Sequence, residues 1–182
     1  MNISNALTVS RIFMVPVIAL LLFHDVLIQS VIAAAIFGAA MVTDFLDGYL
    51  ARKYHQESDL GKLLDPLADK FLIATVMIML IPLNRIPAWM VAVIVARELA
   101  VTGLRSIAAE KNIIIPADWL GKYKTAFQCT AIIPLLVHYP ILGLQFQLAG
   151  EFFMWIALFF TIWSGVDYFI HYIRIQYFAS AT

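Results

Sequence analysis

The chain has few charged residues and only one cysteine, and each shortage narrows its possible functions. Charged residues make up 13% of the 182 positions, and 12 Lys and Arg are balanced by 12 Asp and Glu. A nucleic-acid partner is not expected, because binding a phosphate backbone requires a concentrated basic face. The single cysteine, Cys129, cannot form a disulfide within the chain and lies in an apolar segment, so we interpret it as a packing residue.

Other familiar signatures are missing as well. No repeat, low-complexity tract or linker divides residues 1–182, which predicts a single domain. "GKYKT" is not a phosphate-binding P-loop, because Pro116 stands where the first glycine belongs and Tyr123 follows the lysine. The N-terminal "MNISNALTVSR" has no basic region ahead of an apolar core, so we expect it to be retained. Metal-ligand spacing is also missing among the histidines: His24, His55, His138 and His171.

Hydrophobic residues, by contrast, make up 63% of the chain, and its mean hydropathy is +0.88. Long hydrophobic runs predict an all-α, polytopic membrane protein, because a span needs about 20 apolar residues. Ile3 and Leu7 share one face of the first residues while Asn2 and Asn5 lie on others, which predicts a short interfacial helix before the first span. We expect six transmembrane helices, near residues 8–24, 28–52, 60–81, 87–109, 119–139 and 149–173.

Basic residues are concentrated on one side of the predicted bundle, and the opposite side has only Arg85. Because basic loops stay in the cytoplasm, this asymmetry predicts that both termini are cytoplasmic and that the protein lies in the inner membrane. The basic residues of the loops after the second and fourth spans, of their flanks and of the chain ends are Arg11, Arg52, Lys53, Lys62, Arg105, Lys111, Lys122, Lys124 and Arg174.

Four aspartates interrupt the apolar pattern at the cytoplasmic ends of the second and third spans. Asp44 and Asp47 are three residues apart, and Asp65 and Asp69 are four apart, so each pair lies on one face of a helix. Two antiparallel helices joined by a short loop would bring the pairs together. An unpaired Asp costs on the order of 3 kcal/mol in a spanning helix, and four carboxylates would repel one another. The cluster therefore needs a cation.

Two kinds of cation could meet this need. Lysine or arginine is one, but Arg52, Lys53, Lys62 and Lys70 are spread around the helices and cannot all point inward. Hard divalent cations bind oxygen ligands directly. We therefore favour two divalent ions, Mg²⁺ or Mn²⁺, shared between the two pairs.

Small residues lie beside the carboxylates. Gly48 follows the second aspartate directly, Ala51 lies one turn further on, and Gly61 lies one turn before the third aspartate. These residues would let a bulky ligand approach the backbone, although close packing between helices explains them equally well. Pro66 removes a backbone donor, which predicts that the third helix is kinked or begins there.

Together these positions resemble the signature of the CDP-alcohol phosphotransferase family. Residues 44–69 read "DFLDGYLARKYHQESDLGKLLDPLAD". This stretch contains D-x-x-D-G-x-x-A-R, then eight residues, then G-x-x-x-D-x-x-x-D, with every spacing intact. The six predicted helices extend the resemblance over almost the whole chain.

The resemblance implies a reaction and a role for each aspartate. CDP-diacylglycerol would enter from the bilayer, an alcohol from the cytoplasm would attack its phosphorus, and CMP would leave. Asp44, Asp47 and Asp65 would be metal ligands, while Asp69 would touch the second metal and take the proton of the attacking hydroxyl. The family also implies a homodimer. Contacts with the CDP-lipid would come from Gly48, Arg52, Ser58 and Gly61, and from an N-terminal group of Asn5, Thr8 and Arg11.

The N-terminal group has an alternative interpretation at each position. Asn5 and Thr8 are residue types that cap helices, and Arg11 could extend its charge to the membrane interface.

The second half of the chain offers cations for an acceptor that carries a phosphate. Arg97 and Arg105 share a face of the fourth span, and Lys122 and Lys124 begin the fifth span on the same side. "ARELAVTGLRSIAAEK" and "DWLGKYKTAFQ" resemble the bacterial branch of the family whose acceptor is sn-glycerol 3-phosphate. Glu98 would orient Arg97. Alternatively, Arg97 only pairs with Glu98, and the lysines only anchor the helix at the interface.

Other functions stay open at this point. The acceptor could be inositol phosphate, or phosphatidylglycerol as in a cardiolipin synthase. A divalent-metal or proton-coupled transporter could use the aspartates as a relay, but its acids would be spread across the membrane depth. Asp167, in "WSGVDYF", is an intramembrane acid to which the resemblance gives no role.

Overall fold

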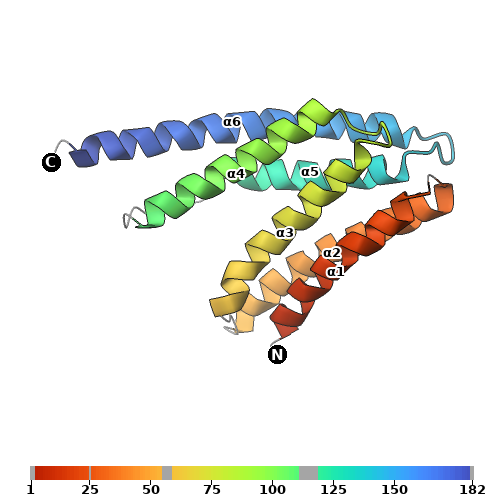
Figure 1. Cartoon of the computed structure of the whole chain (residues 1–182), viewed down its shortest axis with the longest axis horizontal. Coiled ribbons are helices and arrows are strands. Elements are labelled where there is room, and N and C mark those ends of the chain that lie inside the picture. Colours follow the sequence, from red (N-terminus) through yellow and green to blue (C-terminus); the bar gives the residue numbers. More distant parts are fainter. Residues whose placement is uncertain (1–2, 25, 55–58, 111–118, 181–182) are drawn as a thin grey trace.

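The chain is described here by a computed structural model, in which six α-helices and no strand lie within the described residues, so the all-α prediction is confirmed. The backbone is described for residues 3–24, 26–54, 59–110 and 119–180, and the side chains for 13–24, 26–43, 70–108, 110 and 119–175. The helices are α1 (Ile3–Leu22), α2 (Leu27–Tyr54), α3 (Asp59–Leu80), α4 (Ala88–Glu110), α5 (Trp119–Val137) and α6 (Phe146–Ser180) (Figure 1).

The start of the chain differs from the prediction. α1 begins at Ile3 and continues to Leu22, so the separate interfacial helix is wrong. No glycine or proline stands between Ile3 and Pro16, and the apolar residues continue, so nothing in the sequence ends a first short helix. Asn5 and Thr8 lie inside α1, and the capping interpretation of these two residues is therefore wrong too.

Two other helices also begin or end away from the predicted positions. α3 begins at Asp59, so Pro66 lies inside the helix and does not start it. α6 continues to Ser180, and its 35 residues make it about 52 Å long at 1.5 Å per residue. That length exceeds the roughly 30 Å of a bilayer's hydrocarbon core. α6 must therefore tilt or extend beyond the bilayer.

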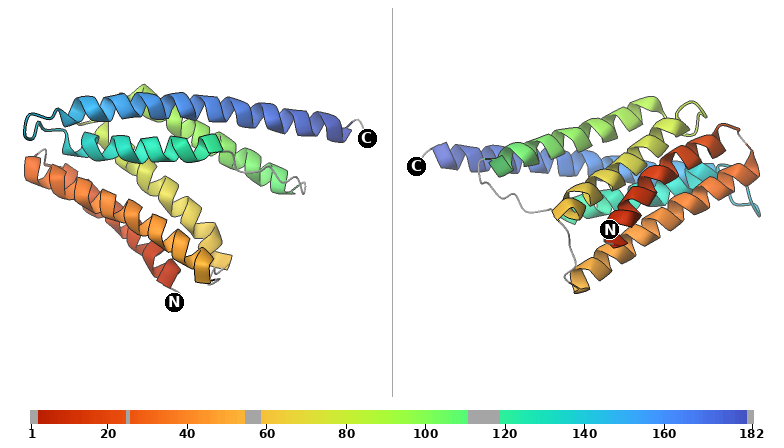
Figure 2. Two further views of the ribbon diagram at one scale, coloured as in Figure 1. Left: turned by 180° about the vertical axis from the view of Figure 1, so that it is seen from behind. Right: turned by 60° about the horizontal axis from the view of Figure 1, so that its bottom comes forward.

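The helices form three consecutive hairpins whose turns meet at one end of the molecule. In Figure 1 the links from α1 to α2, from α3 to α4 and from α5 to α6 all lie on the right. We call this the turn end. Both chain termini, the end of α2, the start of α3, the end of α4 and the start of α5 lie on the opposite side, the termini end. The two further views in Figure 2 show the same arrangement, with the helices spreading apart toward the termini end.

Apolar side chains fill the space between the helices. α1 packs against α2 and α3, α5 packs against α6 and α2, and α4 contacts α6. Phe37, Leu72, Ile94 and Leu135 are fully buried, one from each of α2 to α5. α5 and α6 approach closely at Gly150, where an added Cβ would lie 2.6 Å from Cγ of Leu135. The hairpin of α5 and α6 therefore requires a glycine at this contact.

One helix of the described part is long and apolar enough to cross a membrane, namely α6 over Phe146–Ile175. Shorter apolar stretches occur at Phe13–Leu22 in α1, Leu27–Thr43 in α2 and Lys70–Leu80 in α3. The outer surface of α6 carries large exposed hydrophobic side chains, which suits contact with lipid. They include Phe152, Trp155, Phe159, Trp163, Phe169 and Ile173.

A buried arginine in the link between α3 and α4 joins α2 and α5 at the turn end. Arg85 is 1% exposed, and its guanidinium donates to Oγ of Ser30 at 3.0 Å and to the carbonyl oxygens of Leu135 and Leu136. The two carbonyl groups belong to the last turn of α5, where a helix leaves its acceptors unpaired and favours a cation. The basic residue that stood alone on its side of the predicted bundle is therefore a helix cap.

Candidate active site

The predicted metal ligands lie on two helices that follow each other in the chain. Asp44 and Asp47 are on α2, and Asp65 and Asp69 are on α3. The backbone is helical at all four positions, so each pair shares a helix face as its spacing predicts. Only residues 55–58 separate the helices, which limits the distance between the Cα atoms of Tyr54 and Asp59 to about 19 Å. Carboxylate oxygens are the ligands that Mg²⁺ and Mn²⁺ prefer, so the donor set fits the metals.

The side chains of these aspartates lie outside the described residues, and so do those of the predicted CDP-lipid contacts. Their roles stay predictions. Ser58 is outside the described backbone as well; the other contacts in this group are Asn5, Thr8, Arg11, Gly48, Arg52 and Gly61. Where side chains are described, no three His, Cys, Asp or Glu residues gather as a metal site would require.

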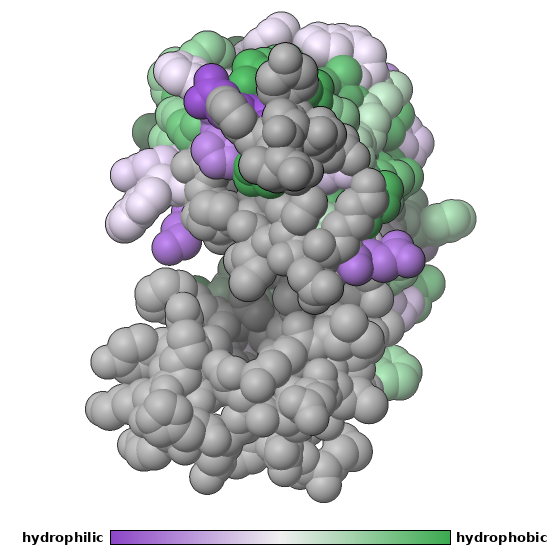
Figure 3. Space-filling model, turned by 90° about the vertical axis from the view of Figure 1, so that its left-hand side faces the viewer, coloured by the Kyte–Doolittle hydropathy of each residue, from purple (hydrophilic) through white to green (hydrophobic). Residues whose placement is uncertain are grey.

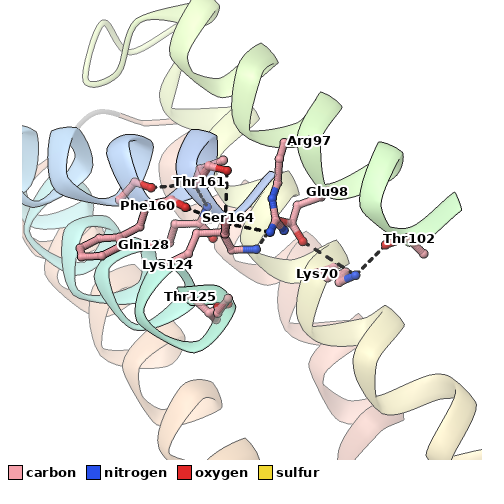
Figure 4. Close-up of polar contacts among 12 residues, drawn as sticks. Lys70, Arg97, Glu98, Thr102, Lys124, Thr125, Gln128, Phe160, Thr161 and Ser164 are labelled. Atoms are coloured by element: carbon pink, nitrogen blue, oxygen red, sulfur yellow. Dashed lines mark hydrogen bonds and ion pairs between the residues drawn. The ribbon is translucent and has the colours of Figure 1, made fainter. Parts of the chain in front are cut away.

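A polar cluster near the middle of the bundle is described in full. Its centre is the carboxylate of Glu98 on α4. Lys124 of α5 donates to Oε1, Nη1 of Arg97 lies 3.0 Å from the same oxygen, and Nζ of Lys70 lies 3.8 Å from Oε2. Lys70 also donates to Oγ1 of Thr102 at 2.7 Å. Figure 4 shows these side chains converging from α3, α4 and α5. We call Lys70, Arg97, Glu98 and Lys124 the Glu98 cluster.

Arg97 is held against α6 by two small neighbours. Its Nη2 donates to Oγ of Ser164 at 2.8 Å, and that hydroxyl donates in turn to the carbonyl oxygen of Phe160 at 2.6 Å. The next residue is Gly165, where an added Cβ would lie 3.1 Å from Cγ of Arg97. Ser164 therefore orients the guanidinium, and Gly165 leaves room for its stem.

One nitrogen of the Arg97 guanidinium has no partner among the described residues. This nitrogen is Nε, and it is buried. A buried donor without an acceptor is costly, typically about 1–3 kcal/mol. This donor is the kind of group that a bound anion would satisfy.

The other two cations predicted for the acceptor lie apart from the Glu98 cluster. The guanidinium carbon of Arg105 lies 5.4 Å from the ring centre of Tyr168 on α6, and Nζ of Lys122 lies 4.8 Å from the ring centre of Trp119. Both side chains are exposed, and both residues are nearer than Arg97 to the termini end. Arg97 and Arg105 do share a helix face, since each contacts α6. Arg97 and Lys124 thus meet at the carboxylate of Glu98, and Arg105 and Lys122 lie outside that contact.

Figure 3 shows the side that lies on the left in Figure 1, where a few hydrophilic groups stand at the edges of the face among hydrophobic ones. Asp167 lies on the exposed surface of α6 in a shallow groove of apolar side chains. The groove is lined by Phe159, Ile162, Trp163, Val166 and Ile170. No contact connects Asp167 with the Glu98 cluster.

Two further predictions concern packing and orientation. Cys129 is half-buried with its Sγ 3.3 Å from Sδ of Met41, as expected for a packing residue. Glu98 does contact Arg97, as its predicted orienting role requires. The sequence patterns gave Ser164 and Gly165 no role and indicated Lys70 only as a possible cation for the aspartates. Ser164 and Gly165 are two small neighbouring residues in an otherwise apolar helix, and this was the signal that could have indicated them. For Lys70 the signal was its position next to Asp69.

Comparison with known proteins agrees with the signature. The profile of the CDP-alcohol phosphatidyltransferase family matches residues 1–163. The chain therefore belongs to the CDP-alcohol phosphatidyltransferase family, whose members are embedded in membranes and generally depend on divalent metals.

Similar proteins cover almost all of the chain. It is 38% identical over 184 residues to the CDP-diacylglycerol–glycerol-3-phosphate 3-phosphatidyltransferase of Bacillus subtilis, covering 92% of this chain and 93% of that protein. It is 35% identical over 173 residues to the Escherichia coli protein of the same name, with 92% of each chain covered. A Mycobacterium tuberculosis protein named "Probable phosphatidylglycerophosphate synthase" is 41% identical over 170 residues, covering 92% of this chain and 79% of that protein. Family membership favours the enzyme over the transporter interpretation.

Proposed function

We propose that the protein transfers the phosphatidyl group of CDP-diacylglycerol to sn-glycerol 3-phosphate, giving phosphatidylglycerophosphate and CMP. The observation that carries this proposal is the similarity over 92% of the chain to proteins named for that reaction. It covers the aspartate signature and also the α4–α6 half, where the Glu98 cluster lies. The same chemistry with inositol phosphate or phosphatidylglycerol as the acceptor is the alternative.

The aspartates carry the chemistry in this proposal. Asp44, Asp47, Asp65 and Asp69 would hold two divalent cations, Mg²⁺ or Mn²⁺, which neutralise the diphosphate and the charge that develops on it. Asp69 accepts the proton of the acceptor hydroxyl as its oxygen attacks the phosphorus on the lipid side. A new P–O bond to the acceptor forms, the P–O bond to CMP breaks, and CMP leaves with the bonding electron pair.

Contacts with the CDP-lipid belong to the residues around the first two aspartates. Gly48 and Gly61 would allow the nucleotide to approach the helix backbone, and Arg52 and Ser58 would contact the CDP group. Asn5, Thr8 and Arg11 belong to the same predicted surface, since α1 packs against both α2 and α3.

Basic residues in the second half of the chain would bind the phosphate of the acceptor. Arg97 and Lys124 are the central pair, because they lie together in a site where water screens charge little. The side chain of Lys124 is 5% exposed and that of Arg97 is 14% exposed. Arg105 and Lys122, both exposed nearer the termini end, would guide the anion toward this pair.

The membrane arrangement is part of the proposal. Six spans, with both termini and the aspartates on the cytoplasmic side of the inner membrane, agree with the gathering of the termini at one end of the bundle. A homodimer follows from the family resemblance. Reporter fusions to the C terminus would test the orientation, and light scattering in detergent would test the dimer.

The reaction itself is tested by CMP release. Purified protein in detergent micelles with CDP-diacylglycerol and Mg²⁺ should release CMP when glycerol 3-phosphate is added. Inositol phosphate and phosphatidylglycerol should give little release under the same conditions. Efficient release with either of those acceptors, and none with glycerol 3-phosphate, would replace the proposed acceptor and leave the chemistry standing.

A further inference from the structure

The charges of the Glu98 cluster do not balance. Lys70, Arg97 and Lys124 supply three positive charges, while Glu98 supplies the one negative charge in contact with all three. Three members of the cluster are largely withdrawn from water, with side-chain exposures of 5% for Lys124, 14% for Arg97 and 19% for Glu98, and Lys70 at its edge is 39% exposed. Buried charges are costly unless they are paired. The described cluster is therefore short of negative charge by two.

A phosphate monoester would supply what the cluster lacks. Its charge near neutral pH is about −1.5 to −2, which matches the deficit. A phosphate oxygen also accepts hydrogen bonds from the same ammonium and guanidinium donors as a carboxylate oxygen. The cations come from α3, α4 and α5 and meet at the carboxylate of Glu98, with hydrogen bonds from Arg97 and Lys124 and an ion pair from Lys70 (Figure 4).

We propose that Glu98 holds the place of the acceptor's phosphate while the site is empty, an inference that rests on the proposed function. When glycerol 3-phosphate binds, Arg97 and Lys124 transfer hydrogen bonds from the carboxylate to the phosphate, and Lys70 exchanges its ion pair with the carboxylate for one with the phosphate. Glu98 is thus a positioning residue. It keeps three like charges together without a ligand, and by competing with the phosphate it limits how tightly substrate and product are held.

Lys70 gives this exchange a connection to the catalytic aspartates. It follows Asp69 directly on α3, and its ammonium group joins that helix to Thr102 and Glu98 of α4. A phosphate that draws Lys70 toward Arg97 also fixes α3 relative to α4. The attacking hydroxyl, a few atoms from that phosphate, is then positioned relative to the residue proposed to take its proton.

The test compares Glu98→Gln with the wild-type protein. Glutamine keeps the size of the side chain and removes its charge, so the anion no longer competes with a carboxylate. In calorimetry with CDP and Mg²⁺ present, the Kd for glycerol 3-phosphate should fall about fivefold or more. Inorganic phosphate should become a stronger competitor by a similar factor. kcat should fall at the same time, because the product carries the same phosphate and leaves more slowly.

Glu110→Gln is the matched control, since Glu110 is exposed at the end of the same helix. It removes an equal charge outside the cluster and should leave the Kd within about twofold of the wild-type value. If the wild-type protein neither binds nor uses glycerol 3-phosphate, the proposed function itself fails. If the wild-type protein does both and Glu98→Gln binds glycerol 3-phosphate equally well or more weakly, the place-holding role is overturned.

A second variant, Glu98→Ala, guards against an effect specific to glutamine. It also removes the competing carboxylate and should lower the Kd in the same direction. Failure of both variants to fold would overturn the proposal, because Glu98 would then be needed to hold the helices together whether or not a ligand is bound.

Discussion

Arg85 and Arg97 are both largely buried, but their surroundings differ in a way that separates structure from function. Arg85, at the turn end, donates to carbonyl oxygens of α5 and to Ser30, groups that are neutral and, in the case of the carbonyls, fixed in a helix. Arg97, near the middle of the bundle, contacts the side chains of Glu98 and Ser164 instead. Partners that can rotate away permit exchange with a ligand, whereas backbone carbonyls do not.

The comparison predicts that substitutions near the termini end change catalysis and those at the turn end change stability. The largest effect is expected for Asp44→Asn, which removes a charged ligand from the proposed metal site. Turnover should fall about a hundredfold or more, with the melting temperature nearly unchanged. Kinetic assays over a range of Mg²⁺ and Mn²⁺ concentrations check this, with Asp167→Asn on the exposed face of α6 as the control. If Asp44→Asn had the wild-type turnover at the metal concentrations that the wild-type protein needs, Asp44 would not be a metal ligand.

Arg85→Met should affect stability next most strongly. It leaves the carbonyl groups of Leu135 and Leu136 without their cation, which should lower the free energy of unfolding by about 2 kcal/mol. Thermal unfolding in detergent measures the loss, and turnover per folded molecule should change little. A large change in the KM for glycerol 3-phosphate would show that the turn end is coupled to the site.

Lys124→Met should change acceptor binding. The KM for glycerol 3-phosphate should rise about tenfold, or about 1.4 kcal/mol, while that for CDP-diacylglycerol stays close to the wild-type value. Arg105→Ala should raise the same KM by a smaller factor, about threefold, because Arg105 lies outside the Glu98 cluster. Varying each substrate in turn checks both variants. Equal increases in KM for the two variants would show that both Lys124 and Arg105 contact the bound phosphate.

The smallest effect is expected for Gly165→Ala. The added methyl group would lie 3.1 Å from Cγ of Arg97 and should displace the guanidinium slightly, raising the KM for glycerol 3-phosphate about twofold. Gly103→Ala is the matched control, because a Cβ at that position meets nothing within 4 Å. An unchanged KM in Gly165→Ala would mean that the stem of Arg97 can shift without moving its head group.

Sequence patterns predicted what depends on local periodicity. Long apolar runs separated by proline-containing turns gave six helices, and the three- and four-residue spacings placed each aspartate pair on one helix face. A separate first helix was wrong because the polar Asn5 changed the local pattern without interrupting α1. The helix-forming tendency of the residues that follow outweighed it.

Contacts between distant helices were beyond the sequence alone. Arg97 and Ser164 are 67 residues apart, and Lys124 and Glu98 are 26 apart, so only the packing of α4 against α5 and α6 brings them together. The eight-residue spacing of Arg97 and Arg105 correctly gave a shared face. The spacing could not predict that the side chain of Arg97 is half-buried beside a carboxylate, whereas that of Arg105 is exposed above an aromatic ring.

The cap formed by Arg85 also has a consequence for how the chain is assembled as it is synthesised. Its helix acceptors, Leu135 and Leu136, are 50 and 51 residues further along the chain. Before the ribosome has synthesised α5, Ser30 is present but the carbonyl groups of Leu135 and Leu136 are not. The guanidinium must therefore stay hydrated until then. In the proposed six-span arrangement, the hairpin of α3 and α4 would enter the bilayer early, and its arginine would leave the aqueous boundary only when α5 arrives. Burial of Arg85 is thus a late step, in which the fifth helix joins the first four.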